Sequence, residues 1–288
     1  MRTLMLDRLL LLAAAVLFST GGAAIKATRL TGWQVASFRS GVGAVALLVL
    51  SREARRGWSW RALPVGLAYA ATLVLFVLAN KLTTAANAIF LQDAAPLYLV
   101  LLGPLLLGER ARKSELLLLV AVAAGIAMFF VAQEAPRQTA PDPLRGNVLA
   151  VIAGWTWALT IAGLRWLGRG YGAAVANAPV LGNVLAFGAC LGMALPVGAM
   201  GWQDAAVIVY LGVVQIGLAY VCMTRALKRV RALEASLLLL VEPALSPIWA
   251  WLVHGERPGR WSLAGGALIL GACLVYSSSR QKEPDERD

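Results

Sequence analysis

Apolar segments of about 20 residues follow one another along most of this 288-residue chain, separated by short charged or Pro- and Gly-containing stretches. A helix needs about 20 apolar residues to cross the hydrocarbon core of a bilayer, so the pattern predicts membrane-spanning helices. Hydrophobic residues make up 59% of the chain and charged residues 14%, whereas soluble domains average about 45–50% and about 25%. This composition argues against a water-soluble enzyme, which could not bury so much apolar surface.

The segments predict an all-α integral membrane protein with ten transmembrane helices. The first segment could be taken for a signal peptide, but further apolar segments follow it instead of a polar mature domain. The predicted spans are residues 6–25, 33–51, 62–80, 84–107, 115–132, 146–164, 172–197, 203–224, 232–254 and 261–278.

The basic residues predict how these helices are oriented. A net charge of +11 would indicate nucleic-acid binding in a soluble protein. Here, with the N-terminus placed in the cytoplasm, 18 Lys and Arg residues fall on the cytoplasmic side of the predicted spans and 7 on the opposite side. The positive-inside rule therefore predicts that both termini are cytoplasmic, and nucleic acid is not an expected partner.

An internal repeat is found when the sequence is shifted by 147 residues, with ten identities in the 33 positions 79–111. The identities include Pro96 with Pro243, and a Gly-Glu-Arg triplet at 108–110 that recurs at 255–257. Because the first triplet falls on the cytoplasmic side and the second on the other, the repeat predicts two inverted five-helix halves. Inverted repeats are a recurring architecture of secondary transporters, whose binding site lies near the bilayer midplane between the halves.

The two stretches that run from Pro96 and from Glu242 to Gly-Glu-Arg resemble the signature of EamA-type domains in the drug/metabolite transporter superfamily. Arg39 and the Gly-Trp-Thr-Trp-Ala stretch that starts at Gly154 also resemble that pattern. The resemblance covers essentially the whole chain as two tandem EamA domains. It implies a five-plus-five inverted arrangement and export of small metabolites through the bacterial inner membrane. The chain departs from the pattern in having Asn183 near the place where a second arginine is expected.

Repeat and resemblance together predict the domain organisation. The first EamA-type repeat is expected at residues 1–134 and the second at 146–279, joined by a polar linker at 135–145 and followed by a cytoplasmic tail at 280–288. Among proteins of the superfamily, the chain looks most like bacterial amino-acid exporters, including those that move aromatic amino acids.

Polar side chains inside predicted spans are the first candidates for a binding site, because each costs free energy at the bilayer centre. Gln92 and Asp93 lie in the fourth span and Glu242 in the ninth, at the matching place in the repeat. A carboxylate on each side of the pseudo-twofold axis predicts a site for a cation or an ammonium group. The alternative is that the two acids cap neighbouring helices or pair with Arg39, without touching a substrate.

The prolines beside these acids predict helix breaks. Pro96 and Pro243 each remove one backbone hydrogen bond and clash with the preceding turn, which frees carbonyl groups near the midplane. We therefore expect a hinge at each proline. Glu109 and Glu256, in the Gly-Glu-Arg triplets, are expected to pair with nearby arginines and to act as latches.

Aromatic and neutral polar residues inside the spans complete the candidate site. Residues two apart on a helix point in directions about 200° apart, so only one of Trp155 and Trp157 can face a central cavity. Packing in the core or against lipid is the alternative for each ring. The candidates are Tyr69, Phe76, Phe90, Tyr98, Trp155, Trp157 and Trp249 for an aromatic wall, and Asn80, Gln215 and Tyr220 for neutral hydrogen bonds.

Two glycine patterns predict close helix packing. Gly41 and Gly43 belong to a stretch that mimics a dinucleotide-binding fingerprint, but they lie in an apolar span with no strand before them. Gly188 and Gly192 form a small-xxx-small pair, which is typical of helix contacts in membranes.

The predicted function is a secondary transporter that exports small metabolites, neutral or aromatic amino acids, by alternating access. The alternatives are the same fold exporting drugs, polyamines or nucleotide sugars and, from other classes, a membrane-embedded enzyme or a channel subunit. The expected partners are a small-molecule substrate and the lipid bilayer, with no obligate protein partner. Three scattered cysteines and a single histidine predict no metal site, and no cofactor or enzymatic motif is expected.

Overall fold

The computed structural model describes residues 2–56, 58–94, 97–98, 113–131, 135–170, 172–198, 200–226 and 238–281. All regular elements in these residues are helices, apart from one isolated bridge between Arg137 and Ala140. In chain order they are α1 (Arg2–Ser19), α2 (Gly21–Lys26), α3 (Gly32–Leu50), η1 (Glu53–Arg55), α4 (Ala62–Leu82), α5 (Ala85–Gln92), α7 (Lys113–Val131), α8 (Pro143–Gly170), α9 (Gly172–Ala194), α10 (Trp202–Val209), the π-helix η2 (Tyr210–Leu218), α11 (Ala219–Ala226), α13 (Val241–His254) and α14 (Arg260–Gln281).

The described helices include six stretches that are long and apolar enough to cross a membrane. They agree with the first, second, third, sixth, seventh and eighth predicted spans. Two shorter apolar helices, Leu117–Val131 and Arg260–Val275, lie at the fifth and tenth. The six stretches are Met5–Lys26, Gly32–Leu50, Ala62–Leu82, Pro143–Gly168, Ala174–Ala194 and Trp202–Met223.

The fourth and ninth predicted spans are interrupted where the sequence places proline. Helix α5 ends at Gln92, the residue whose carbonyl group would accept the hydrogen bond that Pro96 cannot donate. Pro96 itself lies outside the described residues. On the other side, α13 begins at Val241 after a turn at Leu240. Pro243 therefore occupies the first helical turn, where the backbone N–H would have no partner in any case.

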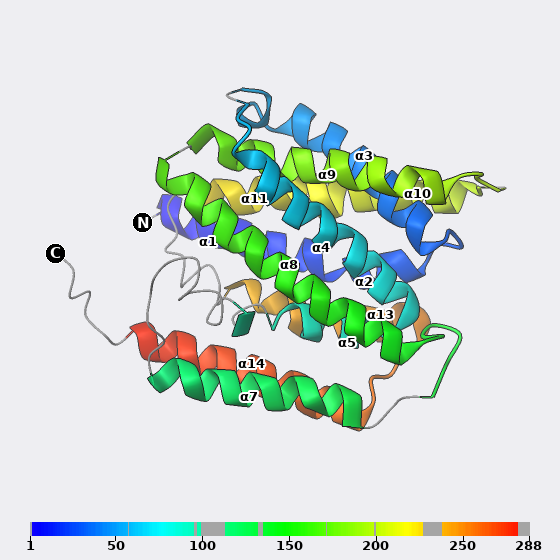
Figure 1. Cartoon of the computed structure of the whole chain (residues 1–288), viewed down its shortest axis with the longest axis vertical. Coiled ribbons are helices and arrows are strands. Elements are labelled where there is room, and N and C mark those ends of the chain that lie inside the picture. The colour runs from blue at the N-terminus through cyan, green and yellow to red at the C-terminus, as the bar shows by residue number, and fades with distance from the viewer. Residues whose placement is uncertain are drawn as a thin grey trace.

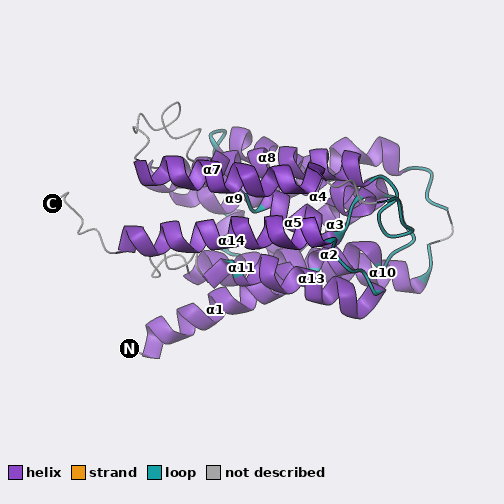
Figure 2. Ribbon diagram, turned by 90° about the horizontal axis from the view of Figure 1, so that it is seen from below, coloured by secondary structure: helices purple, strands orange, loops and turns teal. Residues whose placement is uncertain are grey.

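The helices form one elongated bundle, with α7 and α14 side by side along one edge (Figure 1). Helix α4 packs against α8 and α9, α3 packs against α9 and η2, and α1 packs against α11 and α13. The start of α1 and the end of α14 lie at the same end of the bundle (Figure 2). Helices from the first and second parts of the chain thus alternate in space, which places a shared interface at the centre.

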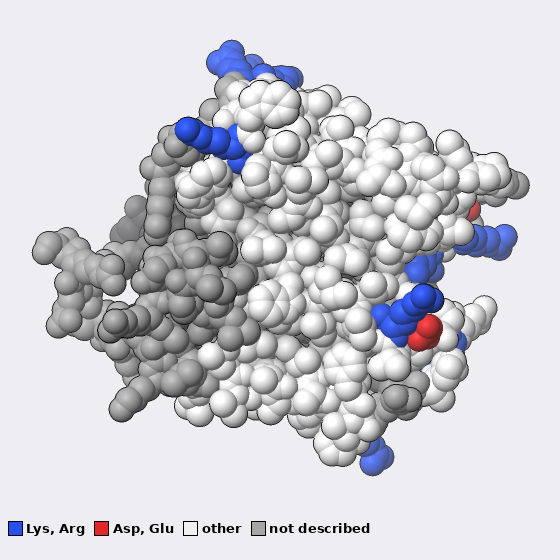
Figure 3. Space-filling model, viewed as in Figure 1, with Lys and Arg blue, Asp and Glu red and all other residues white. Residues whose placement is uncertain are grey.

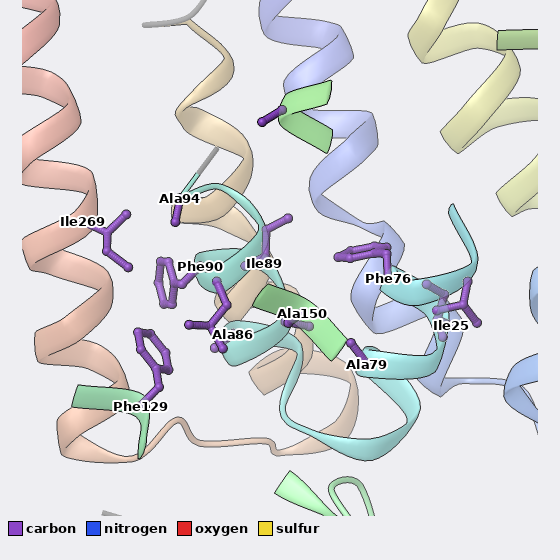
Figure 4. Close-up of a cluster of buried hydrophobic side chains, with 14 of the residues drawn as sticks. Ile25, Phe76, Ala79, Ala86, Ile89, Phe90, Ala94, Phe129, Ala150 and Ile269 are labelled. Carbon is purple, nitrogen blue, oxygen red and sulfur yellow. The ribbon is translucent and has the colours of Figure 1, made fainter. Parts of the chain in front are cut away.

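One hydrophobic cluster extends from the α7–α14 pair through α5 to α4 and α2 (Figure 4), and further members lie on α3 and α9. The ring of Phe90 from α5 points toward Phe129 of α7, with ring centroids 6.2 Å apart, and toward Ile269 of α14. All three side chains are almost fully buried. Phe90 is therefore a packing residue that holds α5 against the outer pair of helices.

Glycines set the closest helix contacts. A Cβ atom at Gly41 would lie 2.9 Å from the Phe187 ring, which confirms the predicted packing role of that stretch. The prediction for Gly188 and Gly192 is wrong among the described residues, because a Cβ atom at either would meet nothing within 4 Å. Gly182, on the same helix, has this role instead: its Cβ would lie 2.5 Å from the Tyr69 ring.

The surface is consistent with a bilayer environment. A broad face without Lys, Arg, Asp or Glu lies between charged side chains that gather toward the helix ends (Figure 3). Trp60, just before α4, is 87% exposed, and Trp202, the first residue of the apolar stretch Trp202–Met223, is 79% exposed. Exposed tryptophans at helix ends are typical of the membrane–water interface.

Candidate functional site

A central cavity of about 80 Å³ lies where the helices of the two parts of the chain meet. Its walls come from α1, α3, α4, α5, α8, η2, α11 and the region around the start of α13. The lining residues are Phe18, Arg39, Tyr69, Thr72, Leu73, Phe76, Gln92, Asp93, Trp157, Gln215, Ile216, Tyr220, Met223, Leu239 and Glu242.

Two acidic side chains, Asp93 and Glu242, line this cavity from helices that pack against each other. Asp93 is the C-cap residue of α5 and Glu242 lies in the first turn of α13. A negative charge is favourable at a helix N-terminus and unfavourable at a C-terminus, so the field of α5 does not explain an acid at position 93. In the described part of the chain, neither carboxyl group forms a helix-cap hydrogen bond or an ion pair with Arg39. Both remain partly exposed to the cavity.

Aromatic rings form much of the remaining wall. The Tyr220 ring meets Tyr69 and Phe18 edge-on, each with ring centroids 5.4 Å apart. Phe76 and Trp157 line the cavity from α4 and α8. A wall of ring faces and edges can hold an apolar or aromatic group and can stabilise a nearby ammonium group.

Neutral polar groups are also available. Gln92 and Gln215 are nearly buried, and the side-chain oxygen of each lacks a hydrogen-bond partner among the described residues. Gln215 lies in η2, and π-helical segments often occur at functional sites because they redirect side chains within a helix. Thr72 is already paired, since its hydroxyl donates to that of Thr156 over 2.9 Å. The two amides are therefore neutral groups that a ligand could satisfy.

Eight of the thirteen residues expected at a binding site line this one cavity: Tyr69, Phe76, Gln92, Asp93, Trp157, Gln215, Tyr220 and Glu242. Trp157 faces the cavity whereas Trp155 stacks on Tyr98, with centroids 4.7 Å apart, so the expected division between the two tryptophans is confirmed.

The other expected residues have contacts elsewhere. Trp249 donates from Nε1 to the Ser19 hydroxyl over 2.9 Å, which ties α13 to α1. Asn80 is buried and donates to the Phe76 carbonyl, one turn earlier on α4. Trp155 and Tyr98 form the stacked pair, and Phe90 packs against Phe129. These five side chains do not line the cavity.

Several lining residues were not proposed from the sequence. Thr72 and Leu73 share the face of α4 that also carries Tyr69 and Phe76. The spacing of three and four residues along that face is the signal that could have identified them. Phe18, Ile216, Met223 and Leu239 are ordinary apolar residues of apolar helices, and no local pattern distinguishes them.

A buried ion pair lies at the end of the bundle opposite the start of α1. Lys26 Nζ lies 3.1 Å from Glu256 Oε2, and the two side chains are 4% and 2% exposed. Lys26 also donates to the backbone carbonyl groups of Thr83 and Thr139. Glu256 Oε1 accepts a hydrogen bond of 2.5 Å from the backbone N–H of Ala85, the first residue of α5. The expected arginine partner of Glu256 is thus wrong: the partner is a lysine at the end of α2, and Glu109 lies outside the described residues.

The ends of two helices also stabilise the charges of this pair. Lys26 is at the C-terminal end of α2 and Glu256 at the N-terminal end of α5, so each charge also meets a helix end of opposite sign. Because Lys26 lies in the first matched segment and Glu256 in the second, the pair joins the two parts of the chain at this end.

The comparisons with known proteins agree with this architecture. The sequence profile of the EamA-like transporter family matches residues 7–131 and again residues 144–278. The pseudopaline exporter CntI of Pseudomonas aeruginosa is 25% identical over 95% of this chain and 96% of its own length. The uncharacterized protein PA1977 of the same species is 30% identical over 97% of this chain and 98% of its own length.

A solved crystal structure of a protein shares the fold, with a TM-score of 0.65 over 96% of this chain and 99% of that chain, at 20% sequence identity. The family profile matches the chain twice in tandem and leaves only short segments unmatched. This chain therefore belongs to the EamA-like transporter family and is a multi-pass membrane transporter.

Proposed function

We propose that this transporter exports small metabolites, neutral or aromatic amino acids, across the bacterial inner membrane by alternating access. The observation that carries the proposal is the central cavity, which combines two acids with an aromatic wall and is lined from both matched segments. The acids suit the ammonium group of an amino acid, and the rings suit an apolar or aromatic side chain. The chain has no phosphate-binding loop, so the energy is proposed to come from an ion or substrate gradient.

The helix contacts support two inverted five-helix halves, and ten spans in all. In such an arrangement α1 corresponds to α8, α3 to α9, α4 to η2 and α11, α5 to α13, and α7 to α14. The α4–α8 contact then has its counterpart in α11–α1, the α4–α9 contact in η2–α3, and the α5–α8 contact in α13–α1. Other contacts join corresponding helices directly, as in α3–α9, α5–α13 and α7–α14. Every one of these contacts exists, which is what a pseudo-twofold axis through the cavity requires.

The proposed orientation places both termini in the cytoplasm. The start of α1 and the end of α14 lie together, in agreement with the excess of basic residues assigned to that side (Figure 2). In this orientation, the Lys26–Glu256 pair closes the outer end.

A second candidate is export of a polyamine or another organic cation, which the two acids in the cavity favour. Proteoliposomes loaded with unlabelled amino acids, polyamines, drugs or nucleotide sugars, with and without a pH gradient, would separate these cargo classes by exchange against a labelled compound. Saturable exchange of amino acids supports the proposal. Exchange of polyamines alone would move it to the second candidate, and exchange of no member of the panel would contradict both.

The outer ion pair is proposed to stabilise the outward-closed state. The Glu256→Gln variant leaves the Lys26 charge buried without a carboxylate, and breaking a buried pair in this way destabilises by roughly 3–5 kcal/mol. We expect a lower thermal midpoint of the purified protein and slower exchange. The double variant Lys26→Met, Glu256→Gln, which removes both charges, is expected to recover part of the loss. A double variant no more stable than Glu256→Gln would show that the pair does not carry the effect.

Pro243 is proposed to act as a hinge. The Pro243→Ala variant removes the ring that disfavours a helical conformation of the preceding residues and lets α13 extend back through the turn at Leu240. We expect exchange to fall severalfold with little change in thermal midpoint. Pro64→Ala, in the first turn of α4, is the matched control and should leave exchange unchanged. Equal exchange rates in Pro243→Ala and wild type would argue against the hinge.

A further inference from the structure

Arg39 is a charged side chain buried at the centre of the molecule. It lies on α3, is 1% exposed and lines the cavity. A guanidinium group stays protonated in proteins and has five N–H donors. One of them, on Nη2, donates to the Leu73 carbonyl over 3.1 Å, while Nε has no hydrogen-bond partner among the described residues.

Among the residues that the structure describes, no acidic side chain forms an ion pair with Arg39. Asp93 and Glu242 are the acids that line the cavity, and neither forms an ion pair with Arg39. Asn183 lies near the place where a second arginine is expected, and its amide donates to the Pro179 carbonyl. A buried charge without an ion-pair partner is strongly unfavourable. An anionic group bound in the cavity would supply this partner.

We propose that Arg39 binds the carboxylate of the cargo and thereby restricts transport to zwitterions whose ammonium group lies near Asp93 and Glu242. This deepens the proposed function and rests on it, since it names the chemical class that the cavity selects. Guanidinium donors match a carboxylate in a paired, bidentate geometry. Tyr69, Tyr220 and Phe76 lie in the same cavity and provide the wall for the apolar part of the cargo.

The cavity volume agrees with a small cargo. About 80 Å³ is well below the roughly 300–1,000 Å³ of pockets for drug-sized ligands. The head group of an amino acid needs little more than its ammonium and carboxylate sites, which the cavity supplies on different helices.

The test compares L-phenylalanine with phenethylamine, which is the same molecule without its carboxylate. Both are tested as competitors of tritiated L-phenylalanine in counterflow into proteoliposomes that contain the wild-type protein. A charged hydrogen bond contributes enough that phenethylamine should need a concentration at least about tenfold higher for half-inhibition.

In Arg39→Gln the two half-inhibitory concentrations should become similar, because only phenylalanine loses affinity. Arg39→Lys should keep part of the preference, and Arg225→Gln, which changes an exposed basic residue outside the cavity, should keep all of it.

The outcomes separate the two proposals. If phenylalanine and phenethylamine compete equally with wild type, the role of Arg39 is contradicted while amine transport stands. If neither competes and other amino acids do not exchange, the proposed function fails and the role of Arg39 with it. If Arg39→Gln does not fold, the comparison of the two competitors in wild type and in Arg39→Lys still tests the proposal. Loss of all preference for phenylalanine in a well-folded Arg39→Lys protein would contradict a role for a cation at this position.

Discussion

Replacing Glu242 by glutamine is expected to lower exchange of an amine-bearing cargo by at least about tenfold, because hydrogen bonds to charged groups contribute roughly 1.5–3 kcal/mol. Asp93→Asn should have a similar effect. Both variants keep the size of the side chain and remove an ionisable carboxyl group from the cavity wall. The measurement is the initial rate of counterflow at a cargo concentration well below half-saturation.

The matched control for both variants is Asp142→Asn. Asp142 accepts a hydrogen bond from the backbone N–H of Arg145 at the start of α8 and does not line the cavity. This variant should exchange cargo at the wild-type rate. If Glu242→Gln and Asp93→Asn also exchange at that rate, and with the same response to an imposed pH gradient, neither acid contacts the cargo or takes part in coupling.

Replacing Gly182 by leucine is expected to prevent assembly of the bundle. A Cβ atom at this position would lie 2.5 Å from Tyr69 Cδ1 and 2.9 Å from the Gly66 carbonyl oxygen, where α9 crosses α4. Overpacking a core typically costs about 1–3 kcal/mol, and a leucine against a backbone atom should exceed this range because the backbone cannot rotate away. We expect little monodisperse protein on size-exclusion chromatography in detergent.

Gly188 on the same helix provides the control. A Cβ atom there meets nothing within 4 Å among the described residues, so Gly188→Leu should give a wild-type elution profile. Similar behaviour of the two leucine variants would mean that the α4–α9 crossing does not depend on Gly182. A folded Gly182→Leu protein would also be expected to exchange cargo poorly, because Tyr69 would be displaced from the cavity.

Hydropathy predicted the helices well because the requirement for about 20 apolar residues is local and strong. The limits of α3 and α4 differ from the predicted spans by no more than two residues. Interruptions were harder to place. Proline indicated the break after Gln92, but nothing in the local sequence indicated the π-helix that begins at Tyr210.

The sequence identified the cavity residues whose charged or amide side chains are energetically unfavourable in a bilayer. These are Gln92, Asp93, Gln215 and Glu242, all of which line the cavity. Aromatic residues were less predictable, because a ring is as stable in a hydrophobic core as in a cavity wall. Phe76 lines the cavity while Phe90 packs against Phe129, and their sequence surroundings are equally apolar.

The partner of Glu256 could not be predicted from the sequence either. The Gly-Glu-Arg repeat identified Glu256 as a latch residue, but its partner depends on where α2 ends in space. Lys26 is 230 residues away in the chain and reaches Glu256 only because α2 and α13 pack together. The same limit applies to Arg39, because only the folded bundle shows that no acid in the described part of the chain pairs with it.

The most direct test of alternating access measures which side of the membrane reaches the cavity. Thr72 lines the cavity and is replaced by cysteine after Cys190, Cys222 and Cys273 have been changed to alanine. Membrane-impermeant thiol reagents are then added to either side of oriented vesicles. The proposed mechanism predicts that cargo slows labelling and that Glu256→Gln shifts reactivity toward the outer side. Labelling at equal rates from both sides, unaffected by cargo or by Glu256→Gln, would contradict it and indicate an open channel.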